Sequence, residues 1–231
     1  MKKHLIITAI ITILLFIGLA TIFGQVKEPR NVSGFSKIEI SNGIDLYIEQ
    51  GNQVSVEAEA RNQEILDNMI TEVSDNTLKI YYRKNIYRFN NMAVYITVKD
   101  IEGIKASGGS DIRSNNGLKV DKLEIKASGG SDIFLNIEAD EFICKISGGS
   151  DASLSGKVGF FDVEASGGSD IKAKDLITDR SEINISGGSD AYITVNKEIN
   201  AHANGGSDLT YFGDATVQNI NASGGSDVHR K

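Results

Sequence analysis

Seven aspartates end a repeated Gly-Gly-Ser-Asp motif, and their carboxylates are the groups of this chain best suited to bind a metal ion. Successive motif aspartates are 21, 19, 19, 20, 18 and 19 residues apart. If the motifs stack directly above one another, neighbouring carboxylates lie about 5 Å apart and repel by about 0.8 kcal/mol in water. Ca²⁺, which prefers carboxylate oxygens, would relieve this repulsion. The pattern therefore predicts weak divalent-cation binding along the column Asp111, Asp132, Asp151, Asp170, Asp190, Asp208 and Asp227.

The motif can also be explained as a structural corner. Glycine adopts positive φ without steric cost, and Ser and Asp side chains bond readily to nearby backbone groups. Backbone N–H groups could thus relieve the repulsion without a metal ion, and in the early coils Lys105, Lys126 and Lys145 could help. The spacing does not fit calcium-binding nonapeptide repeats, and the EF-hand pattern is absent. We expect no cofactor beyond weakly bound Ca²⁺.

A second candidate site is the segment from Arg83 to Phe89, which places three cations and two aromatic residues close together in an acidic protein. Arginine and aromatic residues are enriched at the energetic centres of protein interfaces. We therefore regard Arg83, Tyr87, Arg88 and Phe89 as candidate partner-binding residues. The alternative is a solvated connection whose rings close the end of a coil.

Residues for enzymatic chemistry are poorly represented. His4 lies in the predicted N-terminal leader, His202 is at an outward polar position, and no Gly-x-Ser-x-Gly nucleophile motif occurs. A glycan-cleaving enzyme built on repeats would need one exceptional cluster of carboxylates, whereas this chain spreads near-identical residues along its length. The single cysteine, Cys144, excludes disulfides and cysteine-based zinc sites and is expected to be a core residue. We expect a non-enzymatic protein, with a glycan-active enzyme as the alternative.

Alternating apolar and polar residues flank each motif copy and predict the strands that position it. Ile104-Lys105-Ala106 precedes the first copy, and Ile183-Asn184-Ile185 precedes the fifth. Unbroken alternation places the second serine of each motif inward and the aspartate outward. A period of this length is too short for a helical crossover and suits one coil of stacked strands. The sequence therefore predicts an all-β, right-handed parallel β-helix of about 19–20 residues per coil, with seven motif coils over residues 103–231.

Residues 33–102 predict a less regular first half. Alternation returns around turns at Asn42-Gly43, Gly51-Asn52 and Asp75-Asn76, which indicates strands. Between residues 61 and 70 the apolar spacing becomes helical, with Ile65, Leu66, Met69 and Ile70 on one face. We expect irregular, longer coils and one short helix.

The first 24 residues predict export. A basic start, Met1-Lys2-Lys3-His4, precedes an apolar run from Leu5 to Phe23, which is typical of a signal peptide cleaved before Gln25. The alternative is an uncleaved membrane anchor, the only membrane contact that we expect. Cleavage would remove two lysines and change the net charge from −7 to −9, which argues against nucleic-acid binding. We expect the protein in the periplasm, on the outer-membrane surface or secreted.

Four segments of the first half resemble a known bacterial family. They are Phe35-Ser-Lys-Ile38-Glu-Ile40, Asn42-Gly43-Ile44-Asp45-Leu46, Val54-Ser55-Val56-Glu57 and Thr77-Leu78-Lys79-Ile80. Together with the Ser-Gly-Gly-Ser-Asp repeats they are similar to the auto-transporter adhesin head GIN domain family, over roughly Ser33 to Val228. The resemblance implies an exported β-helical domain. We expect this domain to be a binding or adhesion module whose partner is a protein or glycan of the cell envelope. The resemblance implies no catalytic residues.

Overall fold

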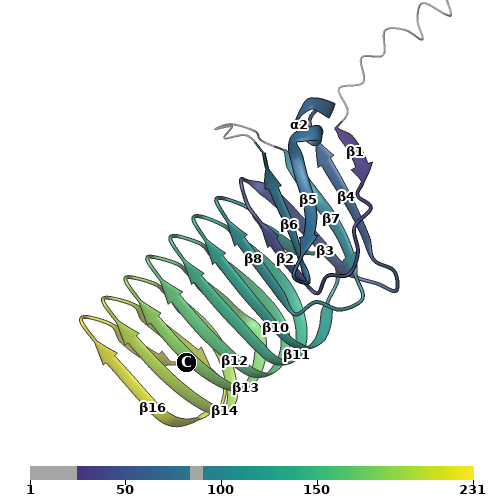
Figure 1. The fold of residues 1–231 in the computed structure, drawn as a ribbon. Coiled ribbons are helices and arrows are strands. Elements are labelled where there is room, and N and C mark those ends of the chain that lie inside the picture. Colours follow the sequence, from purple (N-terminus) through teal and green to yellow (C-terminus); the bar gives the residue numbers. More distant parts are fainter. Residues whose placement is uncertain (1–24, 84–90) are drawn as a thin grey trace, which may run out of the picture.

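The computed structural model describes residues 25–83 and 91–231, and their strands form one sheet that winds into a solenoid (Figure 1). Two short strands, β8 (Gly103–Ser107) and β9 (Ile112–Ser114), begin the repetitive half. Parallel pairing then runs through β10 (Leu118–Ser128), β11 (Ile133–Ser147), β12 (Ala152–Ser166), β13 (Ile171–Ser186), β14 (Ala191–Asn204), β15 (Asp208–Phe212), β16 (Thr216–Ser223) and β17 (Asp227–Arg230). The predicted all-β solenoid is confirmed.

Equivalent positions of successive repeats pair across neighbouring coils. Ile125 pairs with Cys144, Cys144 with Val163, and Val163 with Ile183. Each of these four side chains is fully buried, as the alternation predicted. The rings of Phe142 and Phe161 stack in the same core, 5.2 Å apart and nearly parallel. Burial also raises the pKa of the Cys144 thiol to about 12, so this cysteine is an unreactive core residue.

The Gly-Gly pair makes the sharp corner of every coil that carries the motif. All motif glycines have φ between 65 and 85°, a region that residues with a Cβ rarely adopt. At the first glycine of the pair there is also a packing reason, because a Cβ at Gly167 would meet the backbone nitrogen of Gly148 at 3.2 Å. The second glycine faces open space. Both glycines of the repeat are therefore needed for their backbone conformation. The first glycine is also needed because the neighbouring coil lies too close for a Cβ.

The inward serine of each motif completes the backbone hydrogen bonding at the corner. In successive coils its Oγ accepts from the backbone N–H of the equivalent serine in the preceding coil, over 2.9 to 3.3 Å. The Oγ of Ser131 also donates to the carbonyl of Ser128, at 3.1 Å. Six of these serines are fully buried and Ser226 nearly so. The expectation of an inward serine and an outward aspartate is confirmed, because the aspartates keep partial exposure.

The first half stacks its coils in an order that differs from the chain order. β2 (Lys37–Ile40) and β3 (Ile44–Gln50) form a coil that pairs in parallel with β8 and β9 on one side. On its other side lie β6 (Thr77–Tyr82) and β7 (Met92–Val98), which come later in the chain. The outermost coil of the stack, formed by β6 and β7, therefore comes later in the sequence than the next coil, formed by β2 and β3.

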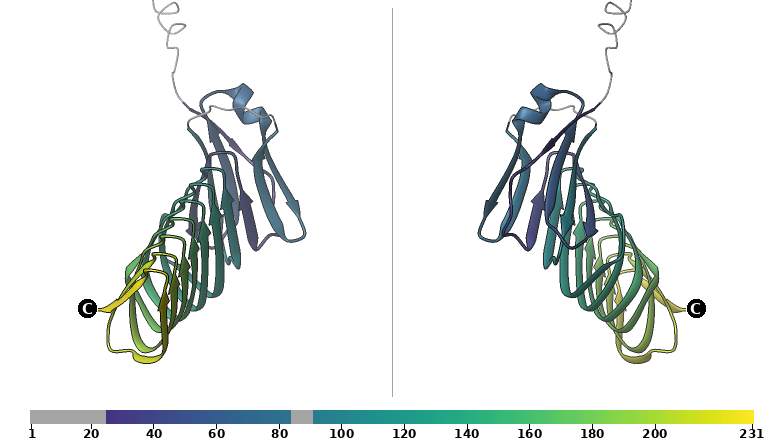
Figure 2. Two further views of the ribbon diagram at one scale, coloured as in Figure 1. Left: turned by 90° about the vertical axis from the view of Figure 1, so that its left-hand side faces the viewer. Right: turned by 90° about the vertical axis from the view of Figure 1, so that its right-hand side faces the viewer.

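Antiparallel strands close the N-terminal end of this stack. β5 (Met69–Ser74) pairs antiparallel with β6, β4 (Ser55–Ala60) with β7, and β1 (Val26–Pro29) with β4. Figure 2 shows these cap strands at one end of the solenoid and the C-terminus at the other. The N-terminal end of the solenoid is thus closed by antiparallel strands.

The predicted short helix is α2 (Gln63–Asn68), which lies on the cap. Its N-terminus is capped by Asn62, whose side chain accepts from the N–H of Ile65 at 2.9 Å. Ile65 and Leu66 are buried, and Met69 ends the helix and begins β5. Within residues 25–83 and 91–231, no helix is long and apolar enough to cross a bilayer.

Candidate functional site

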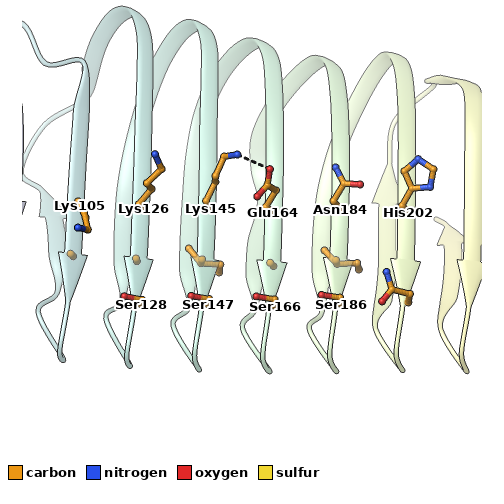
Figure 3. Close-up of a pocket in the computed structure, with 16 residues that line it drawn as sticks. Lys105, Lys126, Ser128, Lys145, Ser147, Glu164, Ser166, Asn184, Ser186 and His202 are labelled. Atoms are coloured by element: carbon orange, nitrogen blue, oxygen red, sulfur yellow. Dashed lines mark hydrogen bonds and ion pairs between the residues drawn. The ribbon is translucent and has the colours of Figure 1, made fainter.

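A polar groove lies on the solenoid face that leads into the glycine corner (Figure 3). It has a volume of about 480 Å³ and crosses β8 and β10 to β14. Two rows of outward side chains line it, each with one residue from successive coils. The long-side-chain row is Lys105, Lys126, Lys145, Glu164, Asn184 and His202, and the short-side-chain row is Ser128, Ser147, Ser166, Ser186 and Asn204.

The alternation of the strands fixes both rows. The residues between them, such as Ala127, Ile146, Ala165 and Ile185, point inward and are at most 3% exposed. Because each strand is hydrogen-bonded to a neighbour on both sides, the outward side chains start from a rigid backbone. In each of β10 to β13 a serine lies two residues after the long side chain, for example Ser128 after Lys126. The short serine side chains leave the space that forms the groove.

At the N-terminal end of the groove, each lysine forms an ion pair with a glutamate that lies in the groove or close to it. Lys105 pairs with Glu39 at 2.7 Å, Lys126 with Glu124 at 2.7 Å, and Lys145 with Glu164 at 2.6 Å. The hydrogen bond from Lys145 to Glu164 raises the pKa of that ammonium group. This end of the groove therefore carries ion pairs, with no excess of positive charge.

Neutral groups line the C-terminal end. Among the described residues, the side chains of Asn184, Ser186, His202 and Asn204 have no hydrogen-bonding partner. Ser166, in the next coil toward the N-terminus, likewise has a free hydroxyl within that part of the chain. The groove thus offers unused donors and acceptors at its neutral end.

The motif aspartates form a ladder on the other side of the corner. From Asp111 to Asp208, the Oδ1 of each aspartate accepts from the backbone N–H of the next one along the column, over 3.1 to 3.3 Å. Asp111 also pairs with Arg113 at 3.1 Å, and Asp151 with Lys172 at 3.0 Å. The expectation that Lys105, Lys126 and Lys145 assist this column is wrong, because the corner separates their row from it and they pair with glutamates.

Asp45 extends this ladder by one coil and was missed by the sequence analysis. Its Oδ1 accepts from the N–H of Asp111 at 3.2 Å, and burial raises its pKa. Asn42, at φ 67°, and Gly43, at φ 68°, take the places of the two glycines in that coil. The available signal was Asn-Gly-Ile-Asp, which shares the turn and the aspartate with the motif but lacks its serine.

The sequence-predicted divalent site remains a prediction. Over residues 25–83 and 91–231, no group of three or more His, Cys, Asp or Glu side chains is gathered to hold a metal ion. The backbone N–H groups occupy one oxygen of each stacked carboxylate from Asp45 to Asp208. Any cation would therefore bind to the other oxygens along the column.

The candidate partner-binding cluster falls largely outside the described residues. Arg83 is exposed at the end of β6, and its backbone N–H donates to the carbonyl of Asn68 at 3.0 Å. Tyr87, Arg88 and Phe89 lie outside the residues that the structure describes. Their role stays a prediction.

A row of aromatic and cationic side chains also escaped the sequence analysis. Tyr47 and Tyr95 stack with centroids 5.0 Å apart, and Lys27 lies 4.2 Å from the Tyr95 centroid while it pairs with Glu57 and Glu59. In the same register, Arg113 lies 3.9 Å from the ring centre of Phe134. These contacts join the cap to the first coils, so we assign them a structural role.

Solved structures share this fold. One is described as the "crystal structure of a putative adhesin" from Bacteroides fragilis, with 22% identity, a TM-score of 0.84 and coverage of 90% of this chain and 97% of that one. A "putative lipid binding protein" from Parabacteroides distasonis has 18% identity, a TM-score of 0.72 and coverage of 90% and 97%. A "putative adhesin" from Parabacteroides merdae has 18% identity, a TM-score of 0.72 and coverage of 90% and 96%.

No curated protein matches the sequence. A family profile, in contrast, matches residues 34–215, which include the cap strands β4 and β5 and the polar groove. The chain belongs to the family described as "Putative auto-transporter adhesin, head GIN domain".

Proposed function

We propose that this protein is an exported, non-enzymatic binding module of the cell envelope, and that it adheres through the polar groove. The observation that carries the proposal is the lining of the groove, in which equivalent positions of successive coils present side chains in two rows. Such a surface repeats its contacts along one direction, which suits an elongated ligand. The family and the adhesin names of its structural relatives support the same reading.

The groove does not favour the alternative of a glycan-cleaving enzyme. A glycosidase needs two carboxyl groups that face each other across the scissile bond. The lining contains one carboxylate, Glu164, which is ion-paired with Lys145. The groove also offers little to a lipid chain, because the apolar residues beneath it are buried.

Adhesion can be tested by blocking the groove. Ser166→Tyr on β12 fills the short-side-chain row, and Ser153→Tyr places the same ring on the same strand outside the groove. We expect the wild-type protein and the Ser153→Tyr variant to bind isolated cell envelopes, and the Ser166→Tyr variant to bind them weakly. Equal binding by both variants would place the adhesive surface elsewhere.

Export is tested separately, because residues 1–24 lie outside the described part of the chain. We expect the protein from its host to begin near Gln25 and to fractionate outside the cytoplasm. N-terminal sequencing that finds Met1 to Phe23 retained would establish a membrane anchor instead.

A further inference from the structure

The neutral end of the polar groove has unused hydrogen-bonding capacity. Asn184 and Asn204 each carry an amide, and His202 and Ser186 add a ring nitrogen pair and a hydroxyl. Figure 3 shows Asn184 and His202 side by side on neighbouring strands, with Ser166 and Ser186 in the row below. Amides and hydroxyls that both donate and accept match a ligand that is rich in hydroxyl groups.

The charge of the groove excludes a polyanion as the favoured ligand. Its three lysines each form an ion pair of 2.6 to 2.7 Å with a glutamate. The chain as a whole carries a net charge of −7. A polyanionic ligand would lose electrostatic energy by approaching such a surface, since it gains no uncompensated cation. The one carboxylate of the lining, Glu164, is paired with Lys145, so the groove offers no free anion to a cationic ligand either. The ligand is therefore expected to be uncharged.

The shape of the groove indicates a linear ligand. The groove follows the stacking direction of the coils, and strands in a sheet are about 4.8 Å apart. From Ser166 on β12 to His202 on β14 the neutral end therefore extends for about 10 Å. The full groove continues through Ser147 and Ser128 toward β8. A polymer of repeated units can meet equivalent groups at each step.

Lipids and extended peptides fit this surface less well. Ala165, Ile185 and Ala203 beneath the groove are 2%, 1% and 1% exposed, so their side chains offer an acyl chain little direct contact. An added peptide strand needs a free sheet edge, whereas β13 is already paired with β12 and β14. The contacts available to a ligand are therefore side-chain hydrogen bonds.

We propose that an uncharged, linear glycan binds along the polar groove, and that Asn184 and His202 provide its main hydrogen bonds. This ligand assignment rests on the proposed adhesive function. Asn184 and His202 lie on strands whose inner faces are buried, so the backbone that carries them is already ordered before the ligand binds.

The test measures binding of the full chain to defined carbohydrates. The probes are oligosaccharides derived from cellulose, xylan and mannan, with alginate oligosaccharides as the anionic comparison. We expect binding to at least one neutral probe, with an affinity that changes less than about twofold between about 50 and about 500 mM NaCl, because no ion pair with the ligand is involved. Binding to alginate alone, or to none of the neutral probes, would overturn the proposal.

Paired variants assign the residues. The double variant Asn184→Ala with His202→Ala should bind the neutral probe about tenfold or more weakly, as expected for the loss of two or more hydrogen bonds. Lys122→Met, on β10 outside the groove, should leave the affinity within about twofold. All variants should melt like the wild type, since the altered side chains are partly exposed. Unchanged affinity of the double variant would overturn the assignment.

The outcome is distinguishable from a failure of the adhesive function. Envelope binding that survives the double variant would leave adhesion standing and refute the glycan site. Neutral-glycan binding that depends on Asn184 and His202, without any envelope binding, would establish the site and refute adhesion.

Discussion

The two serines of each Ser-Gly-Gly-Ser-Asp repeat have the same side chain but lie in different environments. In β11 and the corner that follows it, Ser147 faces the polar groove, whereas Ser150 is fully buried. The Ser150 Oγ accepts the backbone N–H of Ser131 at 3.0 Å, and within the described part of the chain the Ser147 side chain has no such bond. Their mutation should therefore separate structural from binding roles.

We expect Ser150→Ala to destabilise the protein by about 1–3 kcal/mol, because the N–H of Ser131 would be left buried without an acceptor. For a protein of this size, that corresponds to a fall in Tm of several degrees, at about 2–4 °C per kcal/mol. Ser147→Ala should leave Tm unchanged. Thermal melts of both variants check the prediction, and equal Tm values would show that the buried bond contributes nothing.

Asp45 gives a pH-dependent prediction. Burial raises the pKa of its carboxyl above 3.8, so the folded protein holds this proton more tightly than the unfolded chain does. The associated stability is fully present below about pH 3.8 and is lost as the pH rises through the folded pKa. Asp45→Asn keeps an oxygen for the N–H of Asp111 but removes the charge.

The Asp45→Asn variant should consequently have a higher Tm than the wild type at pH 7 and an equal Tm near pH 3. Thermal melts across this range provide the measurement, with Asp45→Ala as the control that also loses the hydrogen-bond acceptor. A pH-independent difference between wild type and Asp45→Asn would mean that burial of the charge is not the cause.

At the scale of elements, the coil repeat could be predicted in detail from the sequence. The alternation around Ile125 and Ile183 gave the correct inward positions, and the constant period gave the correct parallel pairing. The order of coils in the first half could not be predicted. This order depends on the pairing of β2 with both β6 and β8, which are distant from it in the chain. In addition, Asn42 replaces the first glycine of the corner in this coil, so the Gly-Gly motif that marks the later coils is absent.

The groove was only partly predictable for a related reason. Alternation placed Lys105, Asn184 and His202 outward, but it could not show that lysines would pair with glutamates while the amides stay free. The glutamate that pairs with each lysine lies on a neighbouring coil or, for Lys126, two residues earlier in the same strand. Asp45 and the stacked pair of Tyr47 and Tyr95 were missed because their coils carry no Gly-Gly-Ser-Asp motif.

The aspartate ladder allows an element-scale test of weak cation binding. If Ca²⁺ binds the column with a millimolar Kd, a roughly fivefold excess over Kd should stabilise the protein by about 1 kcal/mol, or about 2–4 °C. The triple variant Asp151→Asn, Asp170→Asn and Asp190→Asn should lose most of this shift, because asparagine keeps the Oδ1 acceptor without the charge.

Melts with and without Ca²⁺ at matched ionic strength make this measurement. Absence of a Ca²⁺-dependent shift in the wild type would show that the backbone hydrogen bonds alone relieve the column. A full shift in the triple variant would place the cation elsewhere.

At the scale of the whole molecule, the solenoid is asymmetric in how its two ends are protected. Antiparallel β4 and β5 cover the coil formed by β6 and β7 at one end. At the other end, β16 pairs only with β14 and β17 only with β15 within the described residues. Val217 of β16 is 46% exposed, and the other residues of that strand are exposed or half-buried.

This asymmetry predicts a gradient of local stability along the coils. In a stacked repeat, each coil is stabilised mainly by its neighbours, so a coil with one neighbour opens more readily than a coil with two. We expect backbone amides in β16 and β17 to exchange with solvent fastest and those in β11 to β13 to exchange slowest. Hydrogen exchange followed by mass spectrometry of the full chain measures this directly. Uniform protection from β8 to β17 would instead show that the solenoid opens as one cooperative unit, in which case the polar groove on β8 and β10 to β14 is as rigid at its C-terminal end as at its centre.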